Sequence, residues 1–173
     1  MNVLEHFSRI RTFVFDVDGV LTDGTVQLLP GGEQSRKMSI RDGYALQLAV
    51  KKGYRLAIIS GGRSESVVSR LNGLGITDVY TGVSDKVDRL ETYVLMHDLK
   101  WDEVLFMGDD IPDYRAMQLV GLPACPADAA PEIKSISKYI SPVNGGAGCA
   151  RDVIEKVLKL NGDWQLDEGI SAK

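Results

Sequence analysis

The stretch FVFDVDGVLT, residues 13–22, decides the fold, because an apolar run ends there on two acidic residues and a glycine. Its β-branched and aromatic side chains are typical of a strand buried on both faces. Asp16 and Asp18 stand two positions apart, so both would face one side of an extended chain. Two like charges held close together are unfavourable unless a cation or a shared proton compensates them. A divalent cation that prefers oxygen ligands, such as Mg²⁺, would do so.

Alternating apolar runs and helical patterns extend outward from this stretch. Further apolar runs lie at residues 56–59, 79–80 and 104–107, and helical periodicity marks residues 42–52, 64–74 and 84–99. Strands that are apolar throughout predict an α/β fold, a three-layer Rossmann-like parallel sheet between two helical layers. Ligands bind such sheets at the carboxyl ends of the strands.

Polar residues follow the apolar runs at that edge of the predicted sheet. Ser60 comes directly after one run, and Gly108-Asp109-Asp110-x-x-Asp113 follows another. So many carboxylates would need a metal, and an anionic substrate would then need Lys86 and Ser60 to hold its phosphate oxygens. Each element alone has a structural explanation as a turn, a helix cap or a solvated lysine. Their order and shared placement favour a functional site.

The spacing between the motifs limits what can cover the site. Pro30-Gly-Gly lies between two short extended pieces and predicts a β-hairpin flap at about residues 24–38. No segment is long enough for a cap domain, so we expect one domain over residues 1–173 with no cap and a mobile tail at residues 163–173. A site this open suggests that another subunit supplies a lid.

The composition excludes several classes of protein. The chain has 173 residues with 44% hydrophobic and 25% charged residues, which is typical of one globular domain. A net charge of −4 with scattered basic residues argues against nucleic acid. Cys125 and Cys149 form no CxxC motif and suggest reduced thiols. No apolar run has the length of a signal peptide or of a membrane span, so we expect a cytoplasmic protein with no membrane partner.

The ordered set Asp16-x-Asp18-Gly, Ser60-Gly-Gly, Lys86 and Gly108-Asp-Asp-x-x-Asp113 resembles the four motifs of the haloacid dehalogenase superfamily of phosphohydrolases. Residues 16–24, 40–44 and 145–152 further resemble its capless 3-deoxy-D-manno-octulosonate 8-phosphate phosphatases. The resemblance implies a Mg²⁺-dependent phosphatase of a sugar acid in lipopolysaccharide biosynthesis, acting through an aspartyl phosphate. The alternatives are a phosphatase of a nonulosonate (KDN or sialic acid) 9-phosphate and a non-catalytic oligomerisation module of sugar-acid activation. A signalling receiver domain distributes its acidic residues differently.

The same resemblance assigns roles to individual residues. Asp16 is similar to the nucleophile and Asp18 to the general acid and base, while Ser60 and Lys86 would hold the phosphoryl group. The implied metal ligands are Asp16, Asp18 through its backbone carbonyl, and Asp109, with Asp110 and Asp113 orienting waters or Lys86. The implied substrate-binding residues are Asp18, Arg41, Asp42, Gly43, Gly61, Arg63, Arg70, Lys86 and Arg151.

Two positions of this chain differ from the pattern of the resembled phosphatases, and the resemblance also implies an oligomer. Gln47 stands where an arginine is usual, and Arg63 falls one residue later than in the usual Thr-Gly-Arg. Both bear on the choice between an eight-carbon and a nine-carbon sugar acid. Arg41 could also be an ordinary surface residue at a helix start. Capless relatives form tetramers, so we expect a homotetramer in which the 145–148 loop presents Arg151 across an interface.

Overall fold

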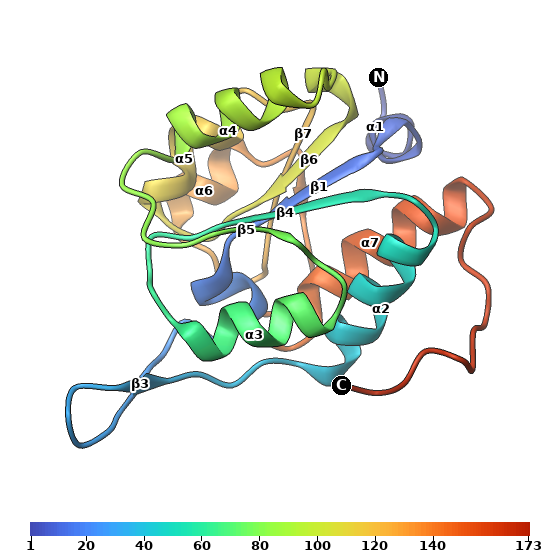
Figure 1. The fold of residues 1–173 in the computed structure, drawn as a ribbon. Helices are drawn as coiled ribbons and strands as arrows, with labels where there is room; N and C mark the ends of the chain where they lie inside the picture. Colours follow the sequence, from blue (N-terminus) through green and yellow to red (C-terminus); the bar gives the residue numbers. More distant parts are fainter.

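A six-stranded parallel sheet with the order β5-β4-β1-β6-β7-β8 forms the centre of the computed structural model, which describes residues 1–173 (Figure 1). Its strands are β1 (Thr12–Phe15), β4 (Arg55–Ile59), β5 (Asp78–Tyr80), β6 (Val104–Met107), β7 (Leu122–Cys125) and β8 (Tyr139–Ile140). β1, β6 and β7 are buried along their whole length. The predicted α/β parallel sheet is confirmed, and β1 lies at its centre.

Helices cover both faces of the sheet (Figure 1). One layer contains α1 (Val3–Arg9), α2 (Ile40–Lys51), α3 (Glu65–Gly73) and α7 (Cys149–Leu160), whose apolar sides share one core cluster with β1 and β4. The other contains α4 (Lys86–Met96), α5 (Tyr114–Met117) and α6 (Pro131–Ile136) around a second cluster. Short helical turns lie at η1 (Val17–Leu21), η2 (Trp101–Glu103) and η3 (Ile111–Asp113). The three predicted layers are therefore present.

The strands β7 and β8 and the helix α7 are among the elements that were not predicted. β7 contains Pro123, which cannot donate to a ladder hydrogen bond, and β8 has only two residues. The helix α7 buries Val153, Ile154, Val157 and Leu158, but it follows a glycine-rich loop without a side-chain cap. The first strand ends at Phe15, and directly after it the Asp16 side chain accepts from the Val17 amide at 2.7 Å.

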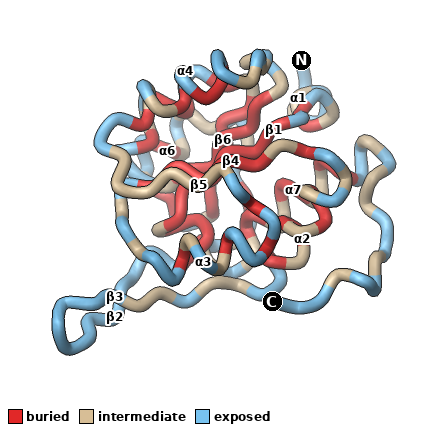
Figure 2. Tube along the Cα trace, in the orientation of Figure 1, coloured by how far each residue is buried: buried red, intermediate tan, exposed pale blue.

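The predicted flap is an exposed hairpin that projects from the body of the molecule (Figure 2). Its strands β2 (Gln27–Leu28) and β3 (Gln34–Ser35) pair antiparallel. Gly31 and Gly32 form its turn with φ of +85° and +83°, a region that favours glycine. No separate cap domain accompanies the hairpin, as the spacing of the motifs predicted.

The carboxy-terminal segment runs back along α2 (Figure 1). Gln47 Nε2 donates to the Ser171 carbonyl at 3.0 Å, and Arg70 Nη2 donates to the Lys173 carbonyl at 2.8 Å. Lys51 also forms an ion pair with Asp167. The mobility expected of residues 163–173 stays a prediction.

The helices of this chain are short. None of them combines the length and the apolar composition that crossing a lipid bilayer requires. The longest, α2 and α7, have 12 residues each, whereas a span needs roughly 20.

Candidate active site

A polar pocket of about 320 Å³ opens at the carboxyl ends of the central strands. This is the edge at which parallel sheets bind ligands. Its walls come from the loops after β1, β4, β5 and β6, and only Val83 and Pro112 interrupt a lining of polar, charged and glycine residues. The lining residues are Asp16, Asp18, Gly24, Ser60, Gly61, Gly62, Val83, Ser84, Lys86, Asp109, Asp110, Pro112 and Asp113.

Gly19 allows the loops after β1 and β6 to meet. Its φ of +86° lies in the region that favours glycine. A Cβ built on Gly19 would lie 1.8 Å from Asp109 Oδ2, so any larger residue would displace that carboxylate. The Asp16-x-Asp18-Gly pattern therefore has a packing reason, since the glycine lets Asp109 approach Asp16.

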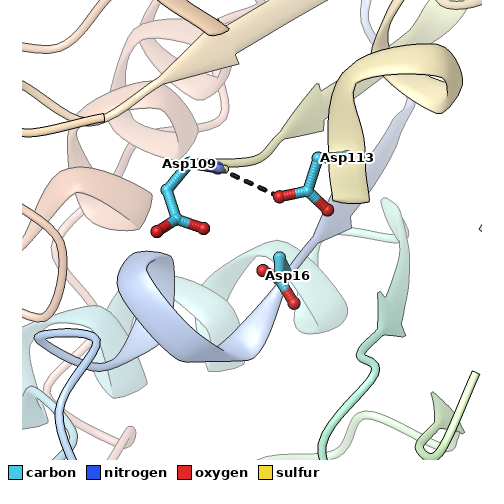
Figure 3. A group of neighbouring side chains, drawn as sticks. All are labelled: Asp16, Asp109 and Asp113. Atoms are coloured by element: carbon cyan, nitrogen blue, oxygen red, sulfur yellow. Dashed lines mark hydrogen bonds between the residues drawn. The ribbon is translucent and has the colours of Figure 1, made fainter. Parts of the chain in front are cut away.

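Three carboxylates converge at this junction (Figure 3). One oxygen each from Asp16, Asp109 and Asp113 lies within 4.8 Å of the others. The Asp109 amide donates to Asp113 Oδ2 at 3.1 Å, which ties two of the three together. The structure thus brings together Asp16 and Asp109, which the sequence placed at the ends of two different strands.

Lys86 is the one cation within this carboxylate group. Its Nζ lies 2.6 Å from Asp113 Oδ1 and 3.0 Å from Asp16 Oδ1, and the residue is 7% exposed. Burial alone would lower the pKa of the lysine, but the two carboxylates outweigh it and raise that pKa. Lys86 therefore stays charged and holds Asp16 and Asp113 in place.

One lysine does not balance three carboxylates. Burial, followed by the charge of Asp113, raises the pKa of Asp16 in spite of Lys86. Burial and the charges of Asp16 and Asp113 likewise raise the pKa of Asp109, which has no lysine or arginine partner. A hard divalent cation would relieve this repulsion, and carboxylate oxygens are the ligands it prefers. The donor set therefore fits a Mg²⁺ ion.

The two other acids of the Gly108-Asp-Asp-x-x-Asp motif are placed differently. Asp113 is 1% exposed and accepts from Lys86 and from the Asp109 amide, so its oxygens are engaged with protein donors. Asp110 is exposed, and its Oδ1 accepts from the Ile111 amide at 2.9 Å to begin η3. Both positions suit residues that orient their neighbours.

Ser60 forms the opposite wall of the pocket. It follows β4 directly, is 3% exposed, and its Oγ accepts from the Gly62 amide at 3.3 Å. Gly61 and Gly62 continue the wall without side chains. Backbone amides and a hydroxyl beside a lysine provide donors for an anionic group.

Asp18 has a partner that the sequence did not predict. Arg36, one residue after β3 in the flap, directs Nε to Asp18 Oδ1 at 2.7 Å and Nη2 to Oδ2 at 3.3 Å. The Asp18 carboxylate is not among the three that converge near Asp109. An arginine in a projecting hairpin ordinarily has a solvated side chain, so no local signal marked Arg36.

Known proteins resemble this chain in sequence and in fold. Residues 70–152 match the family model of the haloacid dehalogenase-like hydrolases. The chain is 33% identical over 170 residues to the 3-deoxy-D-manno-octulosonate 8-phosphate phosphatase KdsC of Yersinia pestis, covering 98% of this chain and 91% of the relative. It is 34% identical to KdsC of Escherichia coli (strain K12) over 167 residues, covering 96% and 88%. The chain belongs to this family of phosphoric monoester hydrolases.

A solved member of the phosphatase family has the same architecture. The 3-deoxy-D-manno-octulosonate 8-phosphate phosphatase of Moraxella catarrhalis, crystallised in complex with a magnesium ion, a phosphate ion and a KDO molecule, superimposes with a TM-score of 0.87 at 30% identity. The match covers 91% of this chain and 90% of that chain. The family resemblance seen in the motifs is thereby confirmed over nearly the whole length.

Most of the substrate-binding residues implied by the family resemblance lie outside the pocket of this single chain. Asp18, Gly61 and Lys86 line it. Arg41 and Arg63, by contrast, are exposed side chains elsewhere on the surface. Arg70 Nη2 points to the Lys173 carbonyl, and Gly43 lies against the same carbonyl. Their roles in substrate binding stay predictions.

Arg151 also makes its contacts within its own chain. Its guanidinium carbon lies 5.3 Å from the centre of the Trp164 ring and 5.7 Å from that of Tyr44, and Nε pairs with Glu155 at 3.4 Å. The preceding glycine loop packs on the loop after β1, since a Cβ on Gly145 would lie 1.9 Å from the Gly19 carbonyl oxygen. In this conformation the loop packs on the connection that follows β1.

Asp42 joins α2 to α7. It is 2% exposed, and its Oδ1 accepts from the Arg151 amide at 2.8 Å in the first turn of α7. Gly148 has no side chain with which to cap that helix, so Asp42 does so from a distance. The other oxygen of Asp42 is buried without a partner, and burial raises the pKa of this carboxyl to about 6 although Arg151 opposes the change.

Replacing Asp42 by asparagine is expected to change how stability depends on pH. The folded chain binds the Asp42 proton more tightly than the unfolded chain, so this carboxyl lowers the free energy of unfolding as the pH rises from about 4 to about 7. Asparagine does not titrate and keeps an acceptor for the Arg151 amide. The unfolding free energy of the variant minus that of the natural chain should therefore rise by about 2–3 kcal/mol between pH 4 and pH 7 in urea titrations.

The exposed Asp88 of α4 provides a matched control. For Asp88→Asn the same difference should stay within about 0.5 kcal/mol across that range. A pH-independent difference for Asp42→Asn would show that the buried carboxyl is charged in both states.

Proposed function

We propose that this chain is a Mg²⁺-dependent phosphomonoesterase that hydrolyses 3-deoxy-D-manno-octulosonate 8-phosphate to the free sugar acid and phosphate. The observation that carries the proposal is the convergence of Asp16 and Asp109 beside the buried Lys86 in one polar pocket. The Moraxella catarrhalis relative, crystallised with magnesium, phosphate and KDO, supports both the metal and the substrate class.

The metal would be held by Asp16, Asp109 and the backbone carbonyl of Asp18. Bound there, Mg²⁺ supplies charge neutralisation for an anionic nucleophile that meets an anionic phosphoryl group. Asp113 and Asp110 keep Lys86 and the neighbouring backbone in position. The raised pKa values of Asp16 and Asp109 support this assignment, because a bound cation would offset the repulsion between the carboxylates that contributes to raising them.

The first chemical step forms a covalent intermediate on Asp16. A carboxylate oxygen of Asp16 attacks phosphorus, and the bond from phosphorus to the sugar oxygen breaks. Asp18 gives its proton to the departing alkoxide. Lys86, the Ser60 hydroxyl and nearby amides hold the phosphoryl oxygens, over which the charge of the transition state is spread.

The second step returns the enzyme to its starting state. Asp18, now a carboxylate, takes a proton from water, and the water oxygen attacks phosphorus. The bond between phosphorus and Asp16 breaks, which releases inorganic phosphate. Two displacements of this kind have lower barriers than one direct attack of water on the ester.

We further propose a homotetramer in which the flap of one subunit covers the site of another. The flap exposes apolar side chains, with Val26 40%, Leu28 75% and Leu29 37% accessible in the single chain. Exposed apolar groups on a projecting hairpin suit a protein contact, and a lid excludes water from phosphoryl transfer. Light scattering that finds a fully active monomer would rule this assembly out.

A screen of phosphorylated sugars and sugar acids tests the proposed function. With Mg²⁺, kcat/KM for 3-deoxy-D-manno-octulosonate 8-phosphate should exceed that for KDN 9-phosphate and for common hexose phosphates by about 10-fold or more. Removing the metal with EDTA should lower all rates by at least about 100-fold, and Mg²⁺ should restore them. A preference for the nine-carbon acid would transfer the assignment to that substrate. A chain without phosphatase activity would favour the oligomerisation module.

A further inference from the structure

The flap contacts the site through Arg36. The Arg36 side chain is 6% exposed although it belongs to a projecting hairpin, because its guanidinium turns back onto Asp18. Two hydrogen bonds, at 2.7 Å from Nε and 3.3 Å from Nη2, each reach a different carboxylate oxygen. A forked pair of this kind fixes the plane of a carboxylate as well as its position.

Gly62 leaves the space that this pair occupies. A Cβ built on Gly62 would lie 3.0 Å from Asp18 Oδ2 and 3.3 Å from Arg36 Nη2. These contacts are tighter than ordinary van der Waals distances, so a side chain at residue 62 would press on both partners. Gly62, the second glycine of Ser60-Gly-Gly-Arg63, therefore has a structural role in this chain, because its lack of a side chain leaves room for Arg36.

We propose that Arg36 is a positioning residue for Asp18 and that Gly62 is its structural counterpart. The inference rests on the proposed phosphatase function, in which Asp18 gives a proton to the leaving oxygen. The shorter bond from Arg36 Nε holds Oδ1, and the longer contact from Nη2 reaches Oδ2, which lies on the side of Gly62. Arg36 itself exchanges no proton.

Substrates with different leaving groups distinguish two possible roles of Arg36, positioning the acid Asp18 and binding the phosphate. An alkoxide needs a proton as it departs, whereas p-nitrophenolate leaves without one. The value of kcat/KM covers only the steps up to breakage of that bond, so the later use of Asp18 as a base does not enter it. Arg36→Ala should therefore lower kcat/KM by about 10- to 100-fold for the alkyl phosphate that the natural chain hydrolyses best, and by less than about 3-fold for p-nitrophenyl phosphate.

Three variants make this comparison specific. Lys37→Ala, at the neighbouring exposed residue of the flap, should leave kcat/KM for both substrates unchanged. Arg36→Lys should recover part of the loss, since it keeps a positively charged donor group but lacks the fork that reaches both carboxylate oxygens. Gly62→Ala should reproduce the selective loss without removing the arginine, because the added methyl group displaces the pair.

Other outcomes would overturn the proposal. An equal loss for both substrates, expressed in KM, would make Arg36 a phosphate-binding residue. Unchanged kinetics for both Arg36→Ala and Gly62→Ala would show that Asp18 needs no positioning.

Hydrogen exchange provides a second readout that does not depend on activity. Arg36→Ala and Asp18→Asn should each speed exchange of the flap amides at residues 27–35 by about 3- to 10-fold, and Lys37→Ala should not. Unchanged exchange in the first two variants would show that the pair does not hold the flap. A natural chain inactive on every phosphate would contradict the proposed function, while the exchange rates would still test the pair.

Discussion

Replacing Asp16 by asparagine is expected to lower kcat by on the order of 10⁴-fold or more in a steady-state assay of phosphate release. An amide oxygen is a poor nucleophile and cannot form the acyl phosphate. Asparagine is nearly isosteric and keeps an acceptor for the Val17 amide, which lies 2.7 Å from Asp16 Oδ1. The loss should therefore come from chemistry and leave folding intact.

Two further measurements make the Asp16 result specific. Asp23→Asn, at an exposed carboxylate of the same connection, should stay within about twofold of the natural rate. Rapid acid quenching of the natural chain with labelled substrate should trap a phosphoryl group that peptide mapping assigns to Asp16. Wild-type turnover by Asp16→Asn of verified mass, or a label on another residue, would contradict the covalent mechanism.

Replacing Lys86 by methionine is expected to affect both rate and stability. Lys86 bridges Asp16 and Asp113 at 3.0 and 2.6 Å, and methionine fills a similar volume without charge. Loss of a preorganised cation should lower kcat/KM by roughly 10²- to 10³-fold. The two carboxylates would remain buried without their partner, which should lower the free energy of unfolding by about 3–5 kcal/mol in the absence of Mg²⁺.

An exposed lysine shows how much of the Lys86 effect comes from its environment. Lys100, whose side chain is 74% exposed, pairs with Glu103 on the surface, and Lys100→Met should change stability by less than about 1 kcal/mol. Urea titrations and kcat/KM for the best substrate measure both variants. Equal effects at residues 86 and 100 would mean that the buried ion pairs contribute neither to catalysis nor to stability.

The residues at strand ends were predictable because the signal is local. Asp16, Ser60 and Asp109 each follow an apolar run closely, and the carboxyl ends of parallel strands meet at one edge. The sheet and its two helical layers followed from the same pattern. The short strand β8 and the proline-containing strand β7 gave no comparable signal, so these two strands at one edge of the six-stranded sheet were not predicted.

Contacts between distant segments explain what the sequence did not reveal. Arg36 and Asp18 are 18 residues apart, and their pairing depends on how the hairpin folds back onto the site. No periodicity in the sequence indicates the direction in which the hairpin folds. The predicted substrate arginine Arg70 meets the Lys173 carbonyl, 103 residues away. Such contacts form only once the elements have packed, because the partners of long polar side chains depend on which groups the packing brings near them.

The central claim is that Asp16 and Asp109 share one divalent cation. Crystals of the natural chain soaked in Mn²⁺, with the metal located by its anomalous scattering, test this claim most directly. The account predicts one strong peak within coordination distance of an oxygen of Asp16 and an oxygen of Asp109, and its loss in Asp109→Ala. A peak elsewhere, or none at a concentration that supports catalysis, would contradict it.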